Sequence, residues 1–226
     1  MTEVYAIMLP DEGVFNKAEP ALLQALEPSR RPAPWRYGHR AVFQRKVLGR
    51  MLLQWAAGNM YSLPANQLTV EKLPIGKPVF DKHPEIHFNV SHSGQWVVVA
   101  LSEAPVGVDV EKVRDVNLAV ARRFFAKEEY AQLISQPPEL QRSFFFDLWT
   151  LKESYLKALG TGLTRPLNTF VVRHEEQQFR LYANGQQLSE TLNQLNLEDD
   201  YKLAVCRFED TATISAQKIT LETLLK

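Results

Sequence analysis

The pattern of hydrophobic and polar residues along the chain predicts short strands separated by helices. Runs in which apolar residues alternate with polar ones, or follow one another between turn-forming residues, predict strands over 4–9, 86–94, 96–102, 106–113, 170–176, 178–184 and 201–209. Apolar residues at helical spacing predict helices over 16–27, 37–61, 117–135 and 139–159. Gly and Pro within 73–80 predict a turn between two further short strands.

The order of these elements suggests two halves, each with a helix followed by antiparallel strands. Pro105 is the natural boundary, so we expect one unit over 1–105 and another over 106–226. The two halves show no convincing repeat by identity, so a duplication is only a weak inference. A cleft between the halves is the default place for a ligand.

Composition narrows the classes of protein. A chain of 226 residues with 45% hydrophobic residues can bury a sizeable core. The 26 basic and 26 acidic residues cancel, so the overall charge does not indicate a polyanionic partner. The N-terminal stretch lacks the basic residues of a signal peptide, and no run approaches the ~20 apolar residues that span a membrane. With a lone Cys206, these features predict a cytoplasmic protein that does not enter a membrane.

The basic residues are nevertheless unevenly distributed. No Asp or Glu occurs between Glu27 and Glu71. The same segment contains the following basic residues: Arg30, Arg31, Arg36, His39, Arg40, Arg45, Lys46 and Arg50. A solvated basic helix face explains such a run most simply. The lack of compensating acids also favours a site for an anion: a phosphate, a nucleic acid or an acidic protein.

The strand predicted over 106–113 carries two acids. Side chains on a strand alternate between its faces, so Asp109 and Glu111 point the same way, ~7 Å apart. Two carboxylates on one face of an apolar strand repel each other unless a positive charge lies between them. The pattern therefore indicates a partner cation.

The helix over 139–159 carries a third acid. Trp149, Glu153 and Lys157 are spaced i, i+4, i+8 and share one helix face. An exposed Glu–Lys pair beside a core tryptophan would also explain this spacing. Three carboxylates with nearby lysines, however, suit Mg²⁺, and no Cys/His pattern suggests zinc. The residues alone indicate Mg²⁺-dependent phosphoryl chemistry.

Three segments resemble the motifs of the 4′-phosphopantetheinyl transferases. These segments are GVDVEKV, FNVSHSGQW and LWTLKESYLKALGTGL, and GKPVF and RRFFAKEEY match further family features. Length and layout resemble the larger, surfactin-synthetase-activating type, for which we expect a monomer. The resemblance implies an α+β fold of two similar subdomains with pseudo-two-fold symmetry, each a small antiparallel sheet packed on a long helix. It also implies transfer of the phosphopantetheine arm of coenzyme A to a serine of an apo carrier-protein domain, releasing adenosine 3′,5′-bisphosphate.

The resemblance also assigns roles to individual residues. Mg²⁺ would bind Asp109, Glu111 and Glu153. Glu153, or a water on the metal, would accept the serine proton, and Lys157 or Lys152 would stabilise the departing phosphate. The coenzyme A contacts would come from Arg30, Lys46, Gly76, Lys77, Pro78, Ser91, His92 and Lys157, with the 3′-phosphate near His92 and the adenine near Gly76.

Three positions depart from the family pattern. The chain has Gln44-Arg45-Lys46 where the family often has His-Arg-Thr, and Ala33 where it often has a lysine. We expect Lys46 to contribute to the 3′-phosphate pocket. Two alternatives use the same residues: a Mg²⁺-dependent phosphatase or nuclease that transfers to water, and a nucleic-acid-binding module built on the basic helix. Neutral overall charge and the lack of a known binding motif count against the second.

Overall fold

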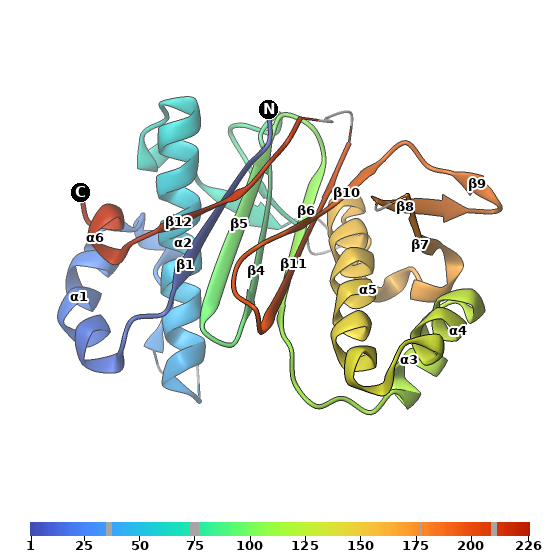
Figure 1. The fold of residues 1–226 in the computed structure, drawn as a ribbon. Coiled ribbons are helices and arrows are strands. Elements are labelled where there is room, and N and C mark those ends of the chain that lie inside the picture. Colours follow the sequence, from blue (N-terminus) through green and yellow to red (C-terminus); the bar gives the residue numbers. More distant parts are fainter. Residues whose placement is uncertain (35–37, 73–76, 177, 209–211) are drawn as a thin grey trace.

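The first half of the chain contributes β1, β5 and β4 to one sheet, forms a small β2-β3 sheet and contains one long helix (Figure 1). The computed structural model describes residues 1–34, 38–72, 77–176, 178–208 and 212–226. The elements of the first half are β1 (Glu3–Met8), α1 (Glu12–Ala25), α2 (Arg40–Tyr61), β2 (Val70–Lys72), β3 (Pro78–Phe80), β4 (His87–Ser93) and β5 (Trp96–Ser102).

The second half repeats this combination and adds shorter elements. They are β6 (Val106–Lys112), α3 (Ala119–Phe124), α4 (Lys127–Ser135), α5 (Pro138–Leu159), β7 (Val171–Glu175), β8 (Gln178–Ala183), β9 (Gln186–Gln187), β10 (Thr191–Leu195), β11 (Tyr201–Arg207), β12 (Ala216–Ile219) and α6 (Leu221–Leu224). Short 3₁₀ turns lie at Pro28–Arg30, Ala65–Gln67, Gly162–Thr164 and Leu167–Thr169.

Two sheets lie between the two long helices (Figure 1). The first has the strand order β12-β1-β5-β4 and the second has the order β10-β11-β6. Helices α2 and α5, of 22 residues each, cover the outer faces. The prediction of an α+β fold, with each long helix packed on its own small sheet, is confirmed.

The alternation of side chains along the strands creates three hydrophobic cores. On β5, Val97 and Val99 pack on the side of α2, whereas Val98 packs between the sheets. On β6, Val108 and Val110 join Val98 in the core between the sheets. A further core surrounds α5. Since β6 is buried from Val106 to Val110, the polar side chain of Asp109 needs partners within the protein.

The segment predicted as one helix over 117–135 is two helices, so that prediction is wrong. Phe125 and Ala126 between α3 and α4 have extended backbone angles. The backbone N–H of Ala126 donates to Oε2 of Glu129 at 2.8 Å. A glutamate at the third position of a helix satisfies an N–H at its start in this way, and it fixes the beginning of α4.

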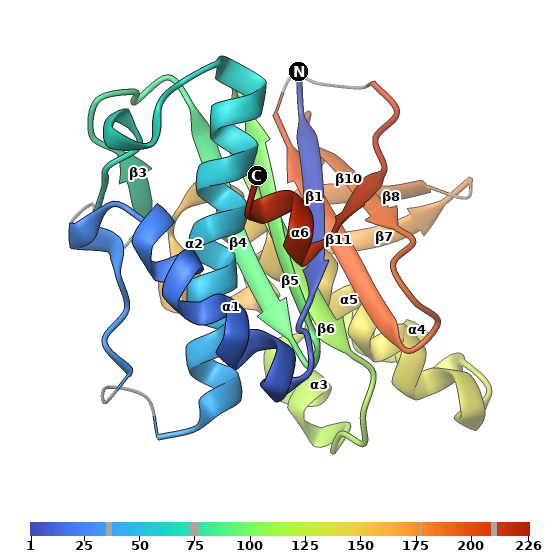
Figure 2. The same cartoon turned by 90° about the vertical axis from the view of Figure 1, so that its left-hand side faces the viewer.

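The last residues of the chain return to the first sheet (Figure 2). Strand β12 pairs with β1 in parallel, with Val4 opposite Ala216. Leu224 of α6 belongs to the core that α2 covers. Residues 216–226 therefore lie with the first half, although they follow Pro105 in sequence; β10, β12 and α6 were not predicted. None of the helices in the described residues is both long and apolar enough to cross a membrane.

Candidate active site

Helix α5 crosses strand β6 at very close range. A β-carbon on Gly107 would lie 2.0 Å from the backbone oxygen of Ser154 and 2.4 Å from the backbone nitrogen of Ala158. Only glycine fits at this crossing. The close approach brings Glu153 and Lys157 against the strand that carries the paired acids.

A cavity of about 330 Å³ lies where β4, β6 and α5 meet. Its walls contain all three acids that the sequence motifs pointed to. The residues that line it are Val90, Ser91, His92, Asp109, Glu111, Trp149, Glu153 and Lys157. As expected, the two acids of β6 lie on the same side of the strand, and the acid of α5 lines the same cavity.

Lys157 ties α5 to β6. Its ammonium donates to Oδ1 of Asp109 at 2.6 Å, to Oγ of Ser91 at 3.0 Å and to the carbonyl of Val108 at 3.2 Å. By contrast, Oδ2 of Asp109 and Oε1 of Glu153 are buried without a hydrogen-bond partner. Unpaired buried carboxylate oxygens are costly, so they mark a place where a cation would bind favourably.

The electrostatics of these acids agree with that interpretation. Burial raises the pKa of Glu153, and nearby Asp109 raises it further, while Lys157 opposes the shift. Burial also raises the pKa of Asp109 against the opposing effect of Lys157. Both acids are therefore harder to ionise than free carboxyl groups, as expected for buried carboxylates that one lysine compensates only in part.

The donor set fits a hard cation such as Mg²⁺. Carboxylate oxygens are the ligands that this ion prefers, and two of them lack partners here. Within the residues that the structure describes, however, no group of three or more His, Cys, Asp or Glu side chains is close enough together to hold a metal ion. The acids would have to draw together around the ion.

Glu111 has two partners that the sequence motifs did not single out. Its Oε2 accepts from Oγ of Ser93 at 2.7 Å and from NH1 of Arg114 at 3.0 Å. The sequence carried a signal for Ser93, because Asn89, Ser91 and Ser93 occupy every second position of one strand and so point to the same side of it.

A second cavity of about 430 Å³ adjoins the first and is strongly basic. The two cavities share Val90 and His92. No acid is among the residues of the described structure that line it. Its walls are Arg30, Arg45, Lys46, Gly49, Arg50, Leu53, Val70, Lys72, Pro78, Phe88, Val90 and His92. The acid-free segment of the sequence therefore supplies most of a cationic cavity.

Burial, and after it the crowding of like charges, lowers the pKa values of three bases of this cavity. The guanidinium of Arg30 is buried and donates to the carbonyl of Leu68 at 2.9 Å. Burial, and then the charge of Arg50, lower the pKa of Arg30 to about 10. Partial burial lowers the pKa of Lys46 and of His92, and neighbouring cations add to both shifts. A bound anion would relieve this repulsion.

The loop predicted to contact adenine is only partly described. Gly76 lies outside the described residues. Pro78 lines the basic cavity, whereas Lys77 does not. The ammonium of Lys77 donates to the carbonyl of Ala158 at 2.9 Å, near the end of α5, and its burial lowers its pKa.

Lys152 does not reach either cavity. It is fully buried, and its ammonium donates to Oε1 of Glu129 at 2.5 Å and to the carbonyl of Phe170 at 2.8 Å. Burial lowers the pKa of Lys152, and Glu129 opposes that effect. The expected catalytic role for Lys152 therefore needs correction: the structure places it in the core that joins α5 to α4 and β7.

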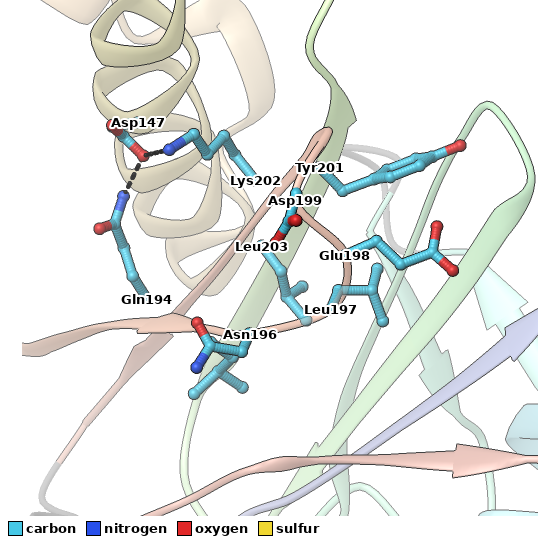
Figure 3. Close-up of a pocket in the computed structure, with 10 residues that line it drawn as sticks. Asp147, Gln194, Asn196, Leu197, Glu198, Asp199, Tyr201, Lys202 and Leu203 are labelled. Atoms are coloured by element: carbon cyan, nitrogen blue, oxygen red, sulfur yellow. Dashed lines mark hydrogen bonds and ion pairs between the residues drawn. The ribbon is translucent and has the colours of Figure 1, made fainter.

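Another cavity, of about 480 Å³, lies beside the β10–β11 turn (Figure 3). Asp147 in its wall accepts from Gln194 at 2.7 Å and from Lys202 at 2.8 Å. Because Asp147 is already paired on two sides, it does not offer an unpaired carboxylate oxygen like that of Asp109. It contains none of the residues that the motifs assigned.

Comparisons with known proteins agree with these features. Residues 17–104 match the family model "4'-phosphopantetheinyl transferase, N-terminal", and residues 105–206 match "4'-phosphopantetheinyl transferase superfamily". The chain is 35% identical to 4'-phosphopantetheinyl transferase psf-1 of Bacillus pumilus, over 99% of this chain and 97% of that protein. The chain belongs to the 4′-phosphopantetheinyl transferase superfamily.

Other members of the superfamily are similar over nearly the whole chain. Transferase Sfp of Bacillus subtilis is 31% identical over 90% of this chain and 91% of its own length. Transferase gsp of Aneurinibacillus migulanus is 32% identical over 99% of this chain and 94% of its own length. The family predicted from three sequence motifs is confirmed, and the phosphatase, nuclease and nucleic-acid-binding alternatives find no support.

Proposed function

We propose that this transferase moves the 4′-phosphopantetheine arm of coenzyme A to a serine of an apo carrier-protein domain, with Mg²⁺ as its cofactor. One observation carries the proposal: a cavity with unpaired buried carboxylate oxygens adjoins a cationic cavity, and both lie at the family motifs. A coenzyme A pyrophosphate suits the first, and its phosphorylated adenosine suits the second.

Asp109, Glu111 and Glu153 are the residues that would hold Mg²⁺. The ion would neutralise charge that develops on the pyrophosphate during phosphoryl transfer. Unpaired oxygens on Asp109 and Glu153, and the raised pKa of both acids, support this assignment.

The remaining steps belong to side chains of this protein. The serine oxygen of the carrier forms a bond to the phosphorus next to the pantetheine arm, and the bond to the adenosine-side phosphate oxygen breaks. Glu153 is the candidate base for the serine proton, since burial raises its pKa and so makes the carboxylate a stronger base. Lys157, which already contacts Asp109 and Ser91, would stabilise the departing adenosine 3′,5′-bisphosphate.

The cationic cavity would hold the 3′-phosphate. Arg30, Lys46 and His92 line it, with Arg45, Arg50 and Lys72 as further cations that the motifs did not assign. Pro78 is the described member of the loop proposed to face the adenine. Ser91 would serve mainly to orient Asp109 and Lys157, because its hydroxyl is hydrogen-bonded to both.

The assay that tests this function combines the protein, coenzyme A, Mg²⁺ and an apo carrier domain. A carrier mass increase of one phosphopantetheine group, with release of adenosine 3′,5′-bisphosphate, is the expected result. Cleavage of coenzyme A without modification of the carrier would overturn the proposal in favour of a hydrolase. Carriers of the peptide synthetase, polyketide synthase and fatty-acid types should be compared, and we expect more than one type to be modified. We also propose that the enzyme is cytoplasmic and monomeric.

A further inference from the structure

Strand β4 lies along β6 although the two strands belong to different sheets. The contact between them, here called the β4–β6 seam, is made by side chains of β4 at alternate positions. Asn89, Ser91 and Ser93 accept hydrogen bonds from the backbone N–H groups of Val108, Val110 and Lys112, at 3.0, 3.2 and 3.1 Å respectively. These bonds satisfy the edge of β6 that would otherwise lack partners.

The two serines of the seam also donate to the acids of β6. Oγ of Ser91 donates to Oδ1 of Asp109 at 2.9 Å, and Oγ of Ser93 donates to Oε2 of Glu111 at 2.7 Å. A hydroxyl has one hydrogen to donate. The backbone N–H of Val110 occupies a lone pair of the Ser91 hydroxyl, and that of Lys112 occupies a lone pair of the Ser93 hydroxyl. Each hydroxyl is therefore held in one orientation, with its hydrogen directed at the carboxylate.

Each acid is therefore held through only one of its two oxygens. Oδ1 of Asp109 also accepts from Lys157 at 2.6 Å, and Oε2 of Glu111 also accepts from Arg114 at 3.0 Å. Oδ2 of Asp109 is buried without a partner. Oε1 of Glu111 makes no hydrogen bond to any residue in the described part of the chain.

We propose that Ser93 is a positioning residue: it fixes one oxygen of Glu111 and thereby presents the other to the metal. The proposal rests on the proposed function, in which Glu111 helps to bind Mg²⁺. Ser91 does the same for Asp109, but it also contacts Lys157, so its removal would change two functional groups at once. Ser93 gives the cleaner test. A further consequence is that metal binding depends on contact between the two halves of the chain.

The test measures metal binding directly on the full-length protein. Mg²⁺ affinity is determined by calorimetry, and Mn²⁺ affinity by electron paramagnetic resonance, without coenzyme A. Loss of a group that orients a metal ligand typically weakens affinity about 10–100-fold. We expect Ser93→Ala to weaken both affinities by about 10-fold and to raise the Mg²⁺ concentration for half-maximal transfer equally. Ser93→Thr, which keeps a hydroxyl, should restore binding.

A matched control separates positioning from general loosening of the seam. Asn89→Ala removes the same kind of bond to the β6 backbone but touches no acid. Ser93→Cys keeps nearly the volume of serine with only a weak donor, so it should bind metal as poorly as Ser93→Ala. Unchanged metal affinity in Ser93→Ala and Ser93→Cys, or an equal loss in Asn89→Ala, would overturn the proposal. A wild-type protein that binds no Mg²⁺ or transfers nothing would instead defeat the proposed function.

Discussion

The ammonium of Lys157 lies 2.6 Å from Oδ1 of Asp109, whereas Oδ2 of the same carboxylate is buried and has no partner. One lysine therefore compensates only part of the negative charge that Asp109 and Glu153 bring together. The remaining oxygens are the part of the site that a divalent cation would complete. This arrangement makes Asp109 the most informative acid to remove.

Asp109→Ala should leave a folded protein that neither binds Mg²⁺ nor transfers phosphopantetheine efficiently. Removing this acid relieves repulsion on Glu153, and Lys157 remains partly exposed, so its charge stays hydrated. We expect the transfer rate to fall by at least about 100-fold, the scale of losing electrostatic stabilisation of a transition state. Circular dichroism and thermal unfolding check the fold. Wild-type transfer by the folded variant would contradict the assignment of Asp109.

Gly107→Ala should disturb the same site without changing any functional group. The added carbon would overlap backbone atoms of Ser154 and Ala158, which cannot move unless α5 moves. Displacement of α5 carries Glu153 and Lys157 with it, so both stability and transfer should fall. Gly13→Ala is the matched control, because a carbon there meets no atom within 4 Å and alanine favours the helix α1 by about 0.5–1 kcal/mol. Equal stability of the two variants would show that α5 does not press on β6.

Lys152→Met should reduce stability, because it leaves the carboxylate of Glu129 buried without its cation. Breaking a fully buried ion pair from one side costs about 3–5 kcal/mol. Lys202→Met is the control, since its pair with Asp147 is partly exposed and should contribute less than about 1 kcal/mol. Urea unfolding measures both. If Lys152→Met kept wild-type stability but lost transfer at saturating substrates, the catalytic role first expected for Lys152 would be restored.

The sequence predicted the parts of the site that periodicity controls. Alternation on a strand placed Asp109 and Glu111 on one side of that strand, and helical spacing placed Glu153 and Lys157 on one face of a helix. Both follow from backbone geometry alone. Motif order then supplied the family. The acid-free segment also supplies most residues of a basic cavity, as its uneven charge suggested, but that this cavity binds an anion stays a prediction.

What the sequence did not predict depends on contacts between distant segments. Lys152 and Lys157 stand on the same helix, and only the packing of α4 shows that Glu129 holds the first in the core. Parallel pairing of β12 with β1 joins residues more than 200 positions apart, which no local pattern encodes. The break between α3 and α4 was missed because a single side chain, that of Glu129, fixes it.

Coenzyme A binding should take up a proton as the pH falls toward the pKa of His92. Partial burial and the charge of Lys46 lower this pKa from 6.5, so the ring is neutral at pH 7 in the free protein. A bound phosphate favours the charged ring and raises its pKa, so affinity should rise with falling pH below about pH 7. Calorimetry in buffers of different ionisation enthalpy measures the proton uptake. The proton uptake should vanish in His92→Gln. It should persist in His174→Gln, because His174 lies outside the cavity.

The same shift predicts the opposite trend for stability without ligand. Because the folded-state pKa of His92 lies below the unfolded value, the unfolded chain binds more protons in the window below pH 6.5. The ligand-free protein should therefore lose stability as the pH falls through that window. Thermal unfolding of wild type and His92→Gln between pH 7.5 and 5.5 compares the two slopes. A wild-type slope no steeper than that of the variant would mean that His92 does not titrate abnormally.

Lys46 should distinguish coenzyme A from its 3′-dephospho form. It lines the basic cavity where the family often has a neutral hydroxyl. Burial lowers the pKa of Lys46, and the nearby cations Arg50, Lys72 and Arg45 lower it further. An ammonium paired with a phosphate in a partly desolvated cavity is stronger than a neutral hydrogen bond. Lys46→Ala should therefore raise KM for coenzyme A and narrow its advantage over 3′-dephospho-coenzyme A by about 1–2 kcal/mol. KM for the dephospho donor should change little.

A control variant shows whether the effect is specific to the cavity. Lys17→Ala removes an exposed lysine of α1 outside the cavity, so it controls for loss of general positive charge. In Lys17→Ala, the advantage of coenzyme A over 3′-dephospho-coenzyme A as donor, here called the donor ratio, should equal that of wild type at both low and high salt. An unchanged donor ratio in Lys46→Ala would mean that Lys46 faces solvent when coenzyme A is bound. In that case Arg30, His92 and the neighbouring arginines would bind the 3′-phosphate without it.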